Sequence, residues 1–365
     1  MTARYDLIVI GGGPAGSAAA ITAARSGARV LLLERGRFPR QKVCGEFVSA
    51  ESLGLLNCLL DAGQRFLLAD AVQITRTRVF LDGQVLQAPV APAAASIARL
   101  DLDDALWSSA QASGAETRQL VAVQGVHGSG PFGVSTSAGD FEATIVVNAS
   151  GRWSNLNPAP PKNVLPRWIG VKAHFEEASP QASVDLYFFD GGYCGVQPVD
   201  LKAGQGDGRI NACAMVRADV ASTLPEVFQQ HPKLFERSQQ WQQLGDPVST
   251  SPLAFHRPRP EHDGLLMAGD AACFVDPFVG DGISLALRSG SLAAECVVPF
   301  FRGTATREEV LQRYRAEYVQ RFGSVFEASS RIRQMLRLPR AVRRPMVALL
   351  TKVPAVTEYL VRNTR

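Results

Sequence analysis

The hydrophobic pattern at the start of the chain predicts a strand, a glycine-rich turn, a helix and a second strand. Residues 5–10 form a short apolar run that is typical of a buried strand. Residues 11–16 then read G-x-G-x-x-G, and an alanine-rich helical stretch continues to about Ser26. A second apolar run, residues 29–33, ends at Glu34. This order predicts a βαβ unit with parallel strands.

Later segments follow a different pattern. Residues 72–86 alternate like paired strands, and four further segments predict strands of one antiparallel sheet: 168–175, 184–189, 195–199 and 209–217. An apolar strand at 264–269 precedes a helix over 283–298 that Pro299 is expected to close. Residues 226–241 predict two short helices separated at Pro232, and residues 307–340 are helical in pattern. The fold class is therefore α/β, with a Rossmann-like domain, an antiparallel sheet domain and a helical C-terminal extension.

The first glycine motif has the features of a dinucleotide-binding turn. Gly11 permits the tight turn, Gly13 lets the backbone approach a pyrophosphate, and Gly16 permits close packing of helix and strand. The helix N-terminus favours the phosphates, and Glu34 can accept hydrogen bonds from ribose hydroxyls. The predicted contacts here are Gly11, Gly13, Pro14, Ala15, Gly16, Glu34 and Arg35.

A second match to the same glycine pattern provides a control. Residues 128–133 also read G-x-G-x-x-G, but they lie between two alternating, strand-like segments and no helix follows. This arrangement predicts a hairpin turn, so the chain contains one dinucleotide-binding unit.

A second pair of motifs resembles those of a known family. Residues 269–272 read G-D-A-A, and Pro277 and the glycines at 280 and 282 precede the helix at 283–298. The pair resembles the para-hydroxybenzoate hydroxylase and geranylgeranyl reductase group of FAD enzymes. This resemblance implies a glutathione-reductase-type domain that holds FAD non-covalently, with Asp270 on the ribityl chain. Weaker matches lie at residues 99–106 and 146–152, so the implied contacts are Arg99, Ala149, Gly151, Gly269, Asp270, Pro277, Gly280, Gly282 and Ile283.

The loop after Glu34 bears on the type of reaction. Residues 42–49 read K-x-C-G-E-x-x-S, which resembles geranylgeranyl reductases and implies that Cys44 and Gly45 lie beside the flavin. Packing of a small residue is the alternative for Cys44. The reductase motif P-x-x-Y-x-W-x-F-P is only partly kept, because Tyr193 and Pro198 match it while Gly195 and Gln197 replace Trp and Phe. The W-x-W-x-I-P signature of flavin halogenases is absent.

These signals leave several reactions open. The main expectation is an NAD(P)H-using monooxygenase that hydroxylates a small aromatic or polyketide-like apolar substrate. The alternative is a reductase of C=C bonds in an isoprenoid or polyketide, and a flavin-dependent halogenase or a non-catalytic flavoprotein ranks below both. The expected catalytic residues are Cys44, Tyr193 and Pro277. NAD(P)H is the expected transient donor, with a protein reductant as the alternative, and His174 is expected to be structural because nothing completes a catalytic triad.

Length, charge and cysteine content limit the number of domains and the kinds of ligand that the protein can bind. The 365 residues suggest about two domains, and the six cysteines show neither a C-x-x-C pair nor zinc-ligand spacing, so no metal is expected. Residues 331–365 contain nine cations and one acid, a net charge of +8, which leaves −4 on residues 1–330 and argues against nucleic-acid binding. The basic tail is expected to be a helical cap or a contact with anionic lipid.

The same observations suggest a location and a division into domains. The early strand leaves no room for a signal peptide, and no apolar run reaches about 18 residues, so a cytoplasmic protein is expected, peripheral to the membrane if the tail binds lipid. The expected FAD-binding domain comprises residues 1–72, 97–158 and 261–303. Residues 73–96 and 159–260 form the expected substrate domain, and residues 304–365 form the basic extension.

Overall fold

The computed structural model describes residues 4–152, 156, 167–201, 207–253 and 255–350. Its first sheet is mainly parallel, and the N-terminal βαβ unit is confirmed. Both neighbours of β1 run parallel to it, and β1 and β2 are buried on both faces over most of their length, as in other parallel sheets. The strand order is β15 (Glu261–His262), β16 (Leu265–Met267), β9 (Gly139–Asn148), β1 (Arg4–Ile10), β2 (Val30–Glu34) and β6 (Glu116–Gln119).

The hairpin expected at residues 128–133 is also confirmed. It joins β7 (Val123–His127) to β8 (Phe132–Thr136), and β8 pairs with β9 at the edge of the first sheet. No helix follows this turn, so the second glycine motif makes a turn and not a phosphate-binding loop.

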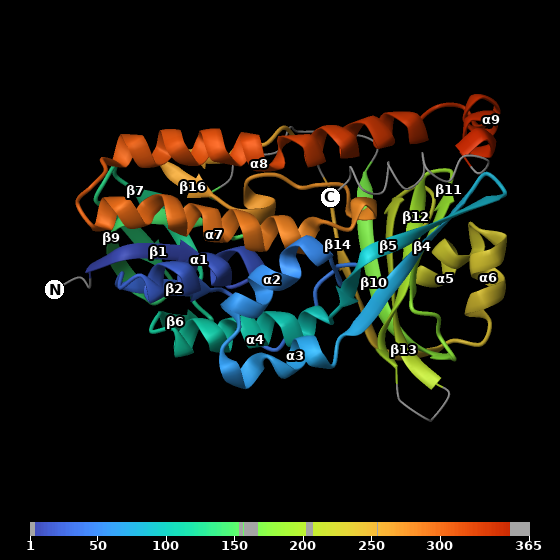
Figure 1. Cartoon of the computed structure of the whole chain (residues 1–365), viewed down its shortest axis with the longest axis horizontal. Coiled ribbons are helices and arrows are strands. Elements are labelled where there is room, and N and C mark those ends of the chain that lie inside the picture. The colour runs from blue at the N-terminus through green and yellow to red at the C-terminus, as the bar shows by residue number, and fades with distance from the viewer. Residues whose placement is uncertain (1–3, 153–155, 157–166, 202–206, 254, 351–365) are drawn as a thin grey trace.

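Helices pack together in a layer against the first sheet (Figure 1). Helix α1 packs against α7 and α4. The close contact between α1 and α7 requires glycine at position 290 of α7, because a Cβ there would overlap the backbone of Ala15. The helix α7 extends beyond its expected end, with Pro299 inside its last turn. The helices on this side are α1 (Pro14–Arg25), α2 (Ala50–Leu59), η1 (Ala62–Gln64), α3 (Phe66–Ala69), α4 (Arg99–Ala112), α7 (Gly282–Phe301) and α8 (Arg307–Leu336).

Helix α7 is long and apolar enough to cross a bilayer by length and composition alone. In the structure, however, 67% of its apolar window is buried inside the protein. It packs against α1 on one side and α8 on another, and Tyr314 and Phe322 of α8 belong to the same hydrophobic core. The first half of α8 is therefore part of this core.

The second sheet stands beside the first one (Figure 1). Helices α5 (Leu224–Gln229) and α6 (Pro232–Ser238), broken at Pro232 as expected, cover one of its faces. Its strand order is β14 (Gln242–Thr250), β10 (Trp168–Ala178), β13 (Asp207–Arg217), β12 (Gly192–Leu201), β11 (Ser183–Phe189), β4 (Val72–Leu81), β5 (Gln84–Ser96) and β3 (Phe47–Val48).

The prediction of a purely antiparallel second sheet is wrong at one pair. Strands β4 and β11 run parallel, in register from Arg76 opposite Ser183 to Phe80 opposite Tyr187. Parallel neighbours need a long crossover connection, and here much of the first sheet lies in the chain between the two strands. The second sheet is therefore mixed.

The described part of the basic tail is held against the second sheet. In α9 (Arg340–Leu350), the buried Arg343 forms hydrogen bonds of 2.6 and 2.8 Å to Asp82, in the turn between β4 and β5. Arg340 lies 3.5 Å from the same carboxylate, while its side chain stays 62% exposed. Residues 351–365 of the predicted tail lie outside the described residues.

Candidate active site

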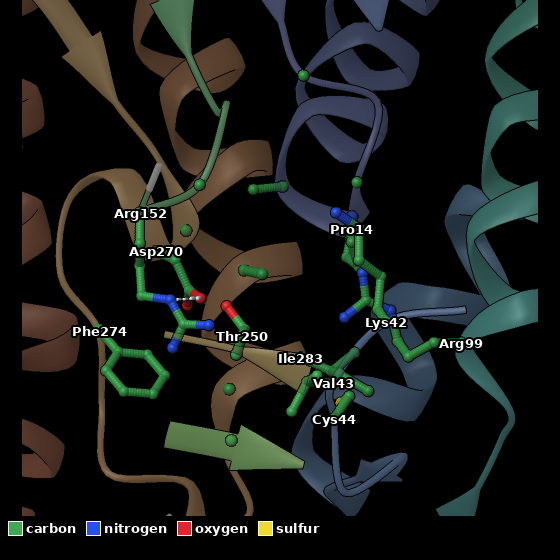
Figure 2. A pocket seen from close by; sticks show the side chains of 18 of the residues that line it. Pro14, Lys42, Val43, Cys44, Arg99, Arg152, Thr250, Asp270, Phe274 and Ile283 are labelled. Carbon is green, nitrogen blue, oxygen red and sulfur yellow. Dashed lines mark ion pairs between the residues drawn. The ribbon is translucent and has the colours of Figure 1, made fainter. Parts of the chain in front are cut away.

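A cavity of about 850 Å³ lies where the carboxyl ends of the parallel strands face the second sheet. It takes residues from the ends of β1, β2 and β9 and from strands of the second sheet, which is the position at which open α/β sheets bind ligands. Every predicted site residue except Gly16 lines it. Figure 2 shows Cys44 and Ile283 close together, with Pro14, Lys42 and Arg99 on one side and Arg152, Asp270 and Phe274 on the other.

The first glycine loop has the shape that a pyrophosphate needs. Gly11 has φ 103°, and a Cβ there would overlap the carbonyl of Ala149; a Cβ on Gly16 would overlap the carbonyl of Gly11. A Cβ on Gly13, in contrast, would meet nothing nearer than Arg99 Nη2 at 3.9 Å. Gly13 therefore faces the cavity, where the first-turn N–H groups of α1 have no helical acceptors.

Glu34 is buried at the edge of this loop and already makes several bonds. Its Oε2 accepts from the N–H of Gly12 at 2.9 Å and pairs with Arg40 at 2.8 Å, and its Oε1 accepts from the N–H of Gly36 at 2.7 Å. Burial raises the pKa of Glu34, but Arg40 and these two N–H groups outweigh it and bring the pKa below its usual value. Oε1 keeps one lone pair that can accept from a ribose hydroxyl.

Cationic side chains gather at the same end of the cavity. Arg99 is held by two 2.7 Å hydrogen bonds to Asp103, one turn along α4. Burial lowers the pKa of Arg99, but the Asp103 carboxylate reverses the effect and raises it above its usual value. Burial, together with the positive charges of Arg40 and Arg99, lowers the pKa of Lys42 to about 8. These cations suit the phosphates of a dinucleotide.

The second motif lines the cavity from the α7 side. Gly269 and Gly280 have φ of 59° and 77°, which explains the glycines at both turns. Gly282 begins α7 with open space around its Cα, so the helix N-terminus faces the cavity. Asp270 lies 3.7 Å from Arg152, whose guanidinium stands over the ring of Phe274 at 3.9 Å (Figure 2).

Cys44 lines the cavity from a loop that both sheets hold in place. Its carbonyl accepts from Asn211 Nδ2 at 2.9 Å, and its half-buried Sγ accepts from the N–H of Glu46 at 3.3 Å. Val43 packs where Gly170 of β10 has no side chain. The predicted Cys44 and Gly45 are thus at the cavity wall, together with Ile283.

The remainder of the cavity is aromatic and apolar. Tyr193, Met215, Leu253 and Phe274 form a buried cluster, and the partly buried Phe278 packs edge-on against Tyr193 with ring centroids 5.9 Å apart. Burial raises the pKa of Tyr193 well above its usual value. Its buried hydroxyl has no hydrogen-bond partner among the described residues. The three predicted catalytic residues, Cys44, Tyr193 and Pro277, thus lie on one cavity.

Sequence analysis missed three polar residues next to this site. Glu46, Lys172 and His174 are buried, and Lys172 and His174 are each hydrogen-bonded to the carboxylate of Glu46. Lys172 and His174 alternate along β10 with buried apolar residues. Polar residues at every second position of a buried strand are the sequence feature that could have indicated them. His174 was expected to be structural, and its pairing with Glu46 was not foreseen.

The residues present fit FAD, since the Gly13 loop is open to a pyrophosphate and the cavity continues past Asp270 to the α7 N-terminus. Residues 6–39 match the family described as FAD dependent oxidoreductase. A digeranylgeranylglycerophospholipid reductase of Methanopyrus kandleri is 28% identical over 89% of this chain and 84% of its own. A menaquinone reductase of Mycobacterium tuberculosis is 27% identical, over 92% and 85%. The chain is thus similar to FAD-dependent oxidoreductases, and these relatives support an enzyme with oxidoreductase activity.

The flavoenzyme's resemblance to the geranylgeranyl reductase group is thereby confirmed. Solved structures agree on the fold. A flavin-dependent brominase superposes with a TM-score of 0.81 at 20% identity, covering 99% of this chain and 93% of its own. A geranylgeranyl bacteriochlorophyll reductase-like protein of Thermoplasma acidophilum gives a TM-score of 0.75 at 21% identity, covering 99% and 96%. At these identities the likeness concerns the fold alone.

Proposed function

We propose that this flavoenzyme reduces C=C bonds in an isoprenoid chain carried by a lipid or quinone. One observation carries the proposal: Gly13 of the dinucleotide loop, Cys44 and the aromatic cluster around Tyr193 all line the same cavity. The relatives at 27–28% identity are named as reductases of prenylated lipids and quinones. This favours the alternative drawn from the sequence over hydroxylation of a small aromatic substrate.

FAD, when bound and reduced, supplies a hydride equivalent. The protein positions the cofactor and the substrate, supplies charges that stabilise the cofactor, and donates a proton to the substrate. Arg99 and the α1 N-terminus hold phosphate at one end of the cavity, and the α7 N-terminus at Gly282 favours negative charge on the ring system at the other. The apolar walls exclude water around the alkene, so the thiol of Cys44 is the group that supplies the proton at carbon.

The departure from the reductase substrate motif changes two positions of β12 near Tyr193. Gly195 occupies the position of a Trp, and a Cβ there would meet Leu186 at an ordinary 3.4 Å. Gln197 stands in place of Phe and donates to Ser96 Oγ at 2.6 Å within the sheet. NAD(P)H is the proposed electron donor, with a protein reductant as the alternative.

An anaerobic experiment tests the reaction type. The purified enzyme is photoreduced without oxygen and mixed with a prenylated quinone or a geranylgeranyl lipid in detergent. A reductase recovers the oxidised flavin absorption at a rate that increases with substrate concentration. A monooxygenase or halogenase stays reduced until oxygen enters, and that result would contradict the proposal.

A further inference from the structure

Helices α2 and α7 meet at their N-terminal ends, where their N-cap residues bond to each other. Within the residues that the structure describes, neither Ser49, the N-cap of α2, nor Asp281, the N-cap of α7, caps its own helix through its side chain. Instead, Ser49 Oγ donates to Asp281 Oδ1 at 2.9 Å. Ser284 Oγ lies 2.7 Å from Ser49 Oγ and accepts the N–H of Ser49 at 3.3 Å. These three side chains connect the first turns of the two helices.

This arrangement leaves the N-terminus of α7 available to a ligand. Asp is favoured at the N-cap position because its side chain normally accepts an N–H of the first turn. Here Gly280, Gly282 and Ile283, on both sides of Asp281, line the cavity. Asp281 itself is 1% exposed, and its carboxyl is directed to Ser49 of α2. The first-turn N–H groups of α7 therefore face the cavity with an acidic side chain directly behind them.

The carboxyl of Asp281 is poorly satisfied where it lies. Its Oδ2 is buried and has no hydrogen-bond partner among the described residues. Burial raises the pKa of Asp281 to about 6, although the hydrogen bond from Ser49 lowers it. An N-cap that served stability alone would bond to its own helix. The carboxyl instead changes its charge close to neutral pH, one residue away from the backbone that lines the cavity.

The charged groups around Asp281 do not fix its ionisation. Arg288, two turns further along α7, lowers the pKa of Asp281, while the exposed Glu51 of α2 raises it. Glu46, in the loop before α2, is bonded to partners on β10 instead. Since Oδ1 bonds to a hydroxyl and Oδ2 to no described group, no ion pair holds the carboxylate. A new charge in the cavity can therefore change the ionisation of Asp281.

We propose that Asp281 lowers the reduction potential of the bound FAD and takes up a proton when the flavin is reduced. Reduction by NAD(P)H or by a photoreductant adds two electrons and one proton to the flavin, which gains one negative charge. The α7 N-terminus favours this charge, and an ionised Asp281 at the same helix end opposes it. The carboxylate then binds one proton from water and becomes neutral. The inference rests on the flavin ring lying at the α7 N-terminus, and it does not depend on the substrate.

Linkage gives the direction of the effect. At about pH 5, Asp281 is mostly neutral in both redox states, so the potentials of the unmodified enzyme and of Asp281→Asn should nearly coincide. At about pH 8 the carboxylate is ionised while the flavin is oxidised and disfavours reduction. The reduction equilibrium of the unmodified enzyme should then be about tenfold less favourable than that of the variant, which is about 30 mV for a two-electron couple.

A redox titration of the FAD-loaded enzyme against a reference dye, repeated between about pH 5 and pH 8, tests the proposal. Glu295→Gln is the matched control, since it removes an exposed acid from the far half of the same helix and should leave the potential unchanged. Ser49→Ala removes a hydrogen bond that lowers the pKa of Asp281, so its potential should separate from that of Asp281→Asn only at higher pH. Equal potentials of the unmodified enzyme and Asp281→Asn at every pH would overturn the proposal.

Proton uptake on photoreduction gives a second readout. At about pH 6.5 and with tenfold coupling, the unmodified enzyme should take up about half a proton more than Asp281→Asn, measured with an indicator dye in weak buffer. Equal uptake would contradict the proposal. If Asp281→Asn does not retain FAD, the unmodified enzyme is compared with Ser49→Ala, and identical potentials at every pH would overturn the role of Asp281. Neither measurement uses a prenylated substrate, so failure of the proposed C=C reduction leaves this result intact.

Discussion

Removal of the Tyr193 hydroxyl should make the protein more stable and the enzyme less effective. This oxygen is buried in the aromatic cluster and has no hydrogen-bond partner among the residues that the structure describes. A buried hydroxyl without a partner costs about 1–3 kcal/mol, because its bonds to water are lost and not replaced. Tyr193→Phe removes this cost and keeps the ring contacts with Phe188 and Phe278.

We therefore expect Tyr193→Phe to raise the free energy of unfolding by about 1–3 kcal/mol, measured by urea denaturation followed by tryptophan fluorescence. If the hydroxyl serves to bind a polar group of the substrate, KM should rise while FAD content is unchanged. A gain in stability with a loss in function is typical of a residue selected for its ligand.

Tyr187→Phe is the matched control in the same sheet. Its hydroxyl accepts a 3.1 Å hydrogen bond from Arg237, so its removal should lower the free energy of unfolding by about 0.5–1.5 kcal/mol. Equal destabilisation in both variants would refute the reasoning, since it would mean that Tyr193 also has a partner in the folded protein.

Three other changes test separate parts of the structure. Asp270→Ala should weaken FAD binding by about 1.5–3 kcal/mol through loss of a charge-assisted bond to the ribityl chain, and an unchanged dissociation constant in equilibrium dialysis would exclude that role. Burial raises the pKa of Asp281 to about 6 from 3.8, so the stability of the unmodified protein, relative to Asp281→Asn, should fall by about 2.4 kcal/mol between pH 4 and 7; parallel pH profiles in urea would contradict this. We propose that Arg340 and Arg344 contact anionic lipid, so replacing both with Gln should abolish salt-sensitive co-sedimentation with anionic vesicles, and equal sedimentation of both proteins would argue against it.

Local patterns were enough to predict the cofactor end of the site. The glycines of both loops, the strand before each one and the helix after each one lie close together in the chain, so spacing alone identified Gly13 and Gly282. The same local reasoning distinguished the hairpin at residues 128–133 from the first glycine motif, because no helix follows the hairpin. The ends of α7 were less predictable, since Pro299 is tolerated in the last turn.

Contacts between distant segments could not be predicted from one sequence. The parallel pairing of β4 with β11 joins residues more than a hundred positions apart, and neither strand has a local feature that indicates its partner. Glu46 was visible only as part of a motif, because Lys172 and His174 lie 126 and 128 positions away. The sequence placed Arg343 in a solvated basic tail, whereas in the structure its side chain is buried and hydrogen-bonded to Asp82.

The mass of the product tests the central claim most directly. The enzyme is incubated in air with NADPH and a prenylated quinone or geranylgeranyl lipid, and the product is analysed by mass spectrometry. Reduction of C=C bonds predicts a gain of about two mass units for each double bond, with no oxygen incorporated from ¹⁸O₂. A gain of about sixteen units that shifts by two further units under ¹⁸O₂ would identify a monooxygenase and contradict the account.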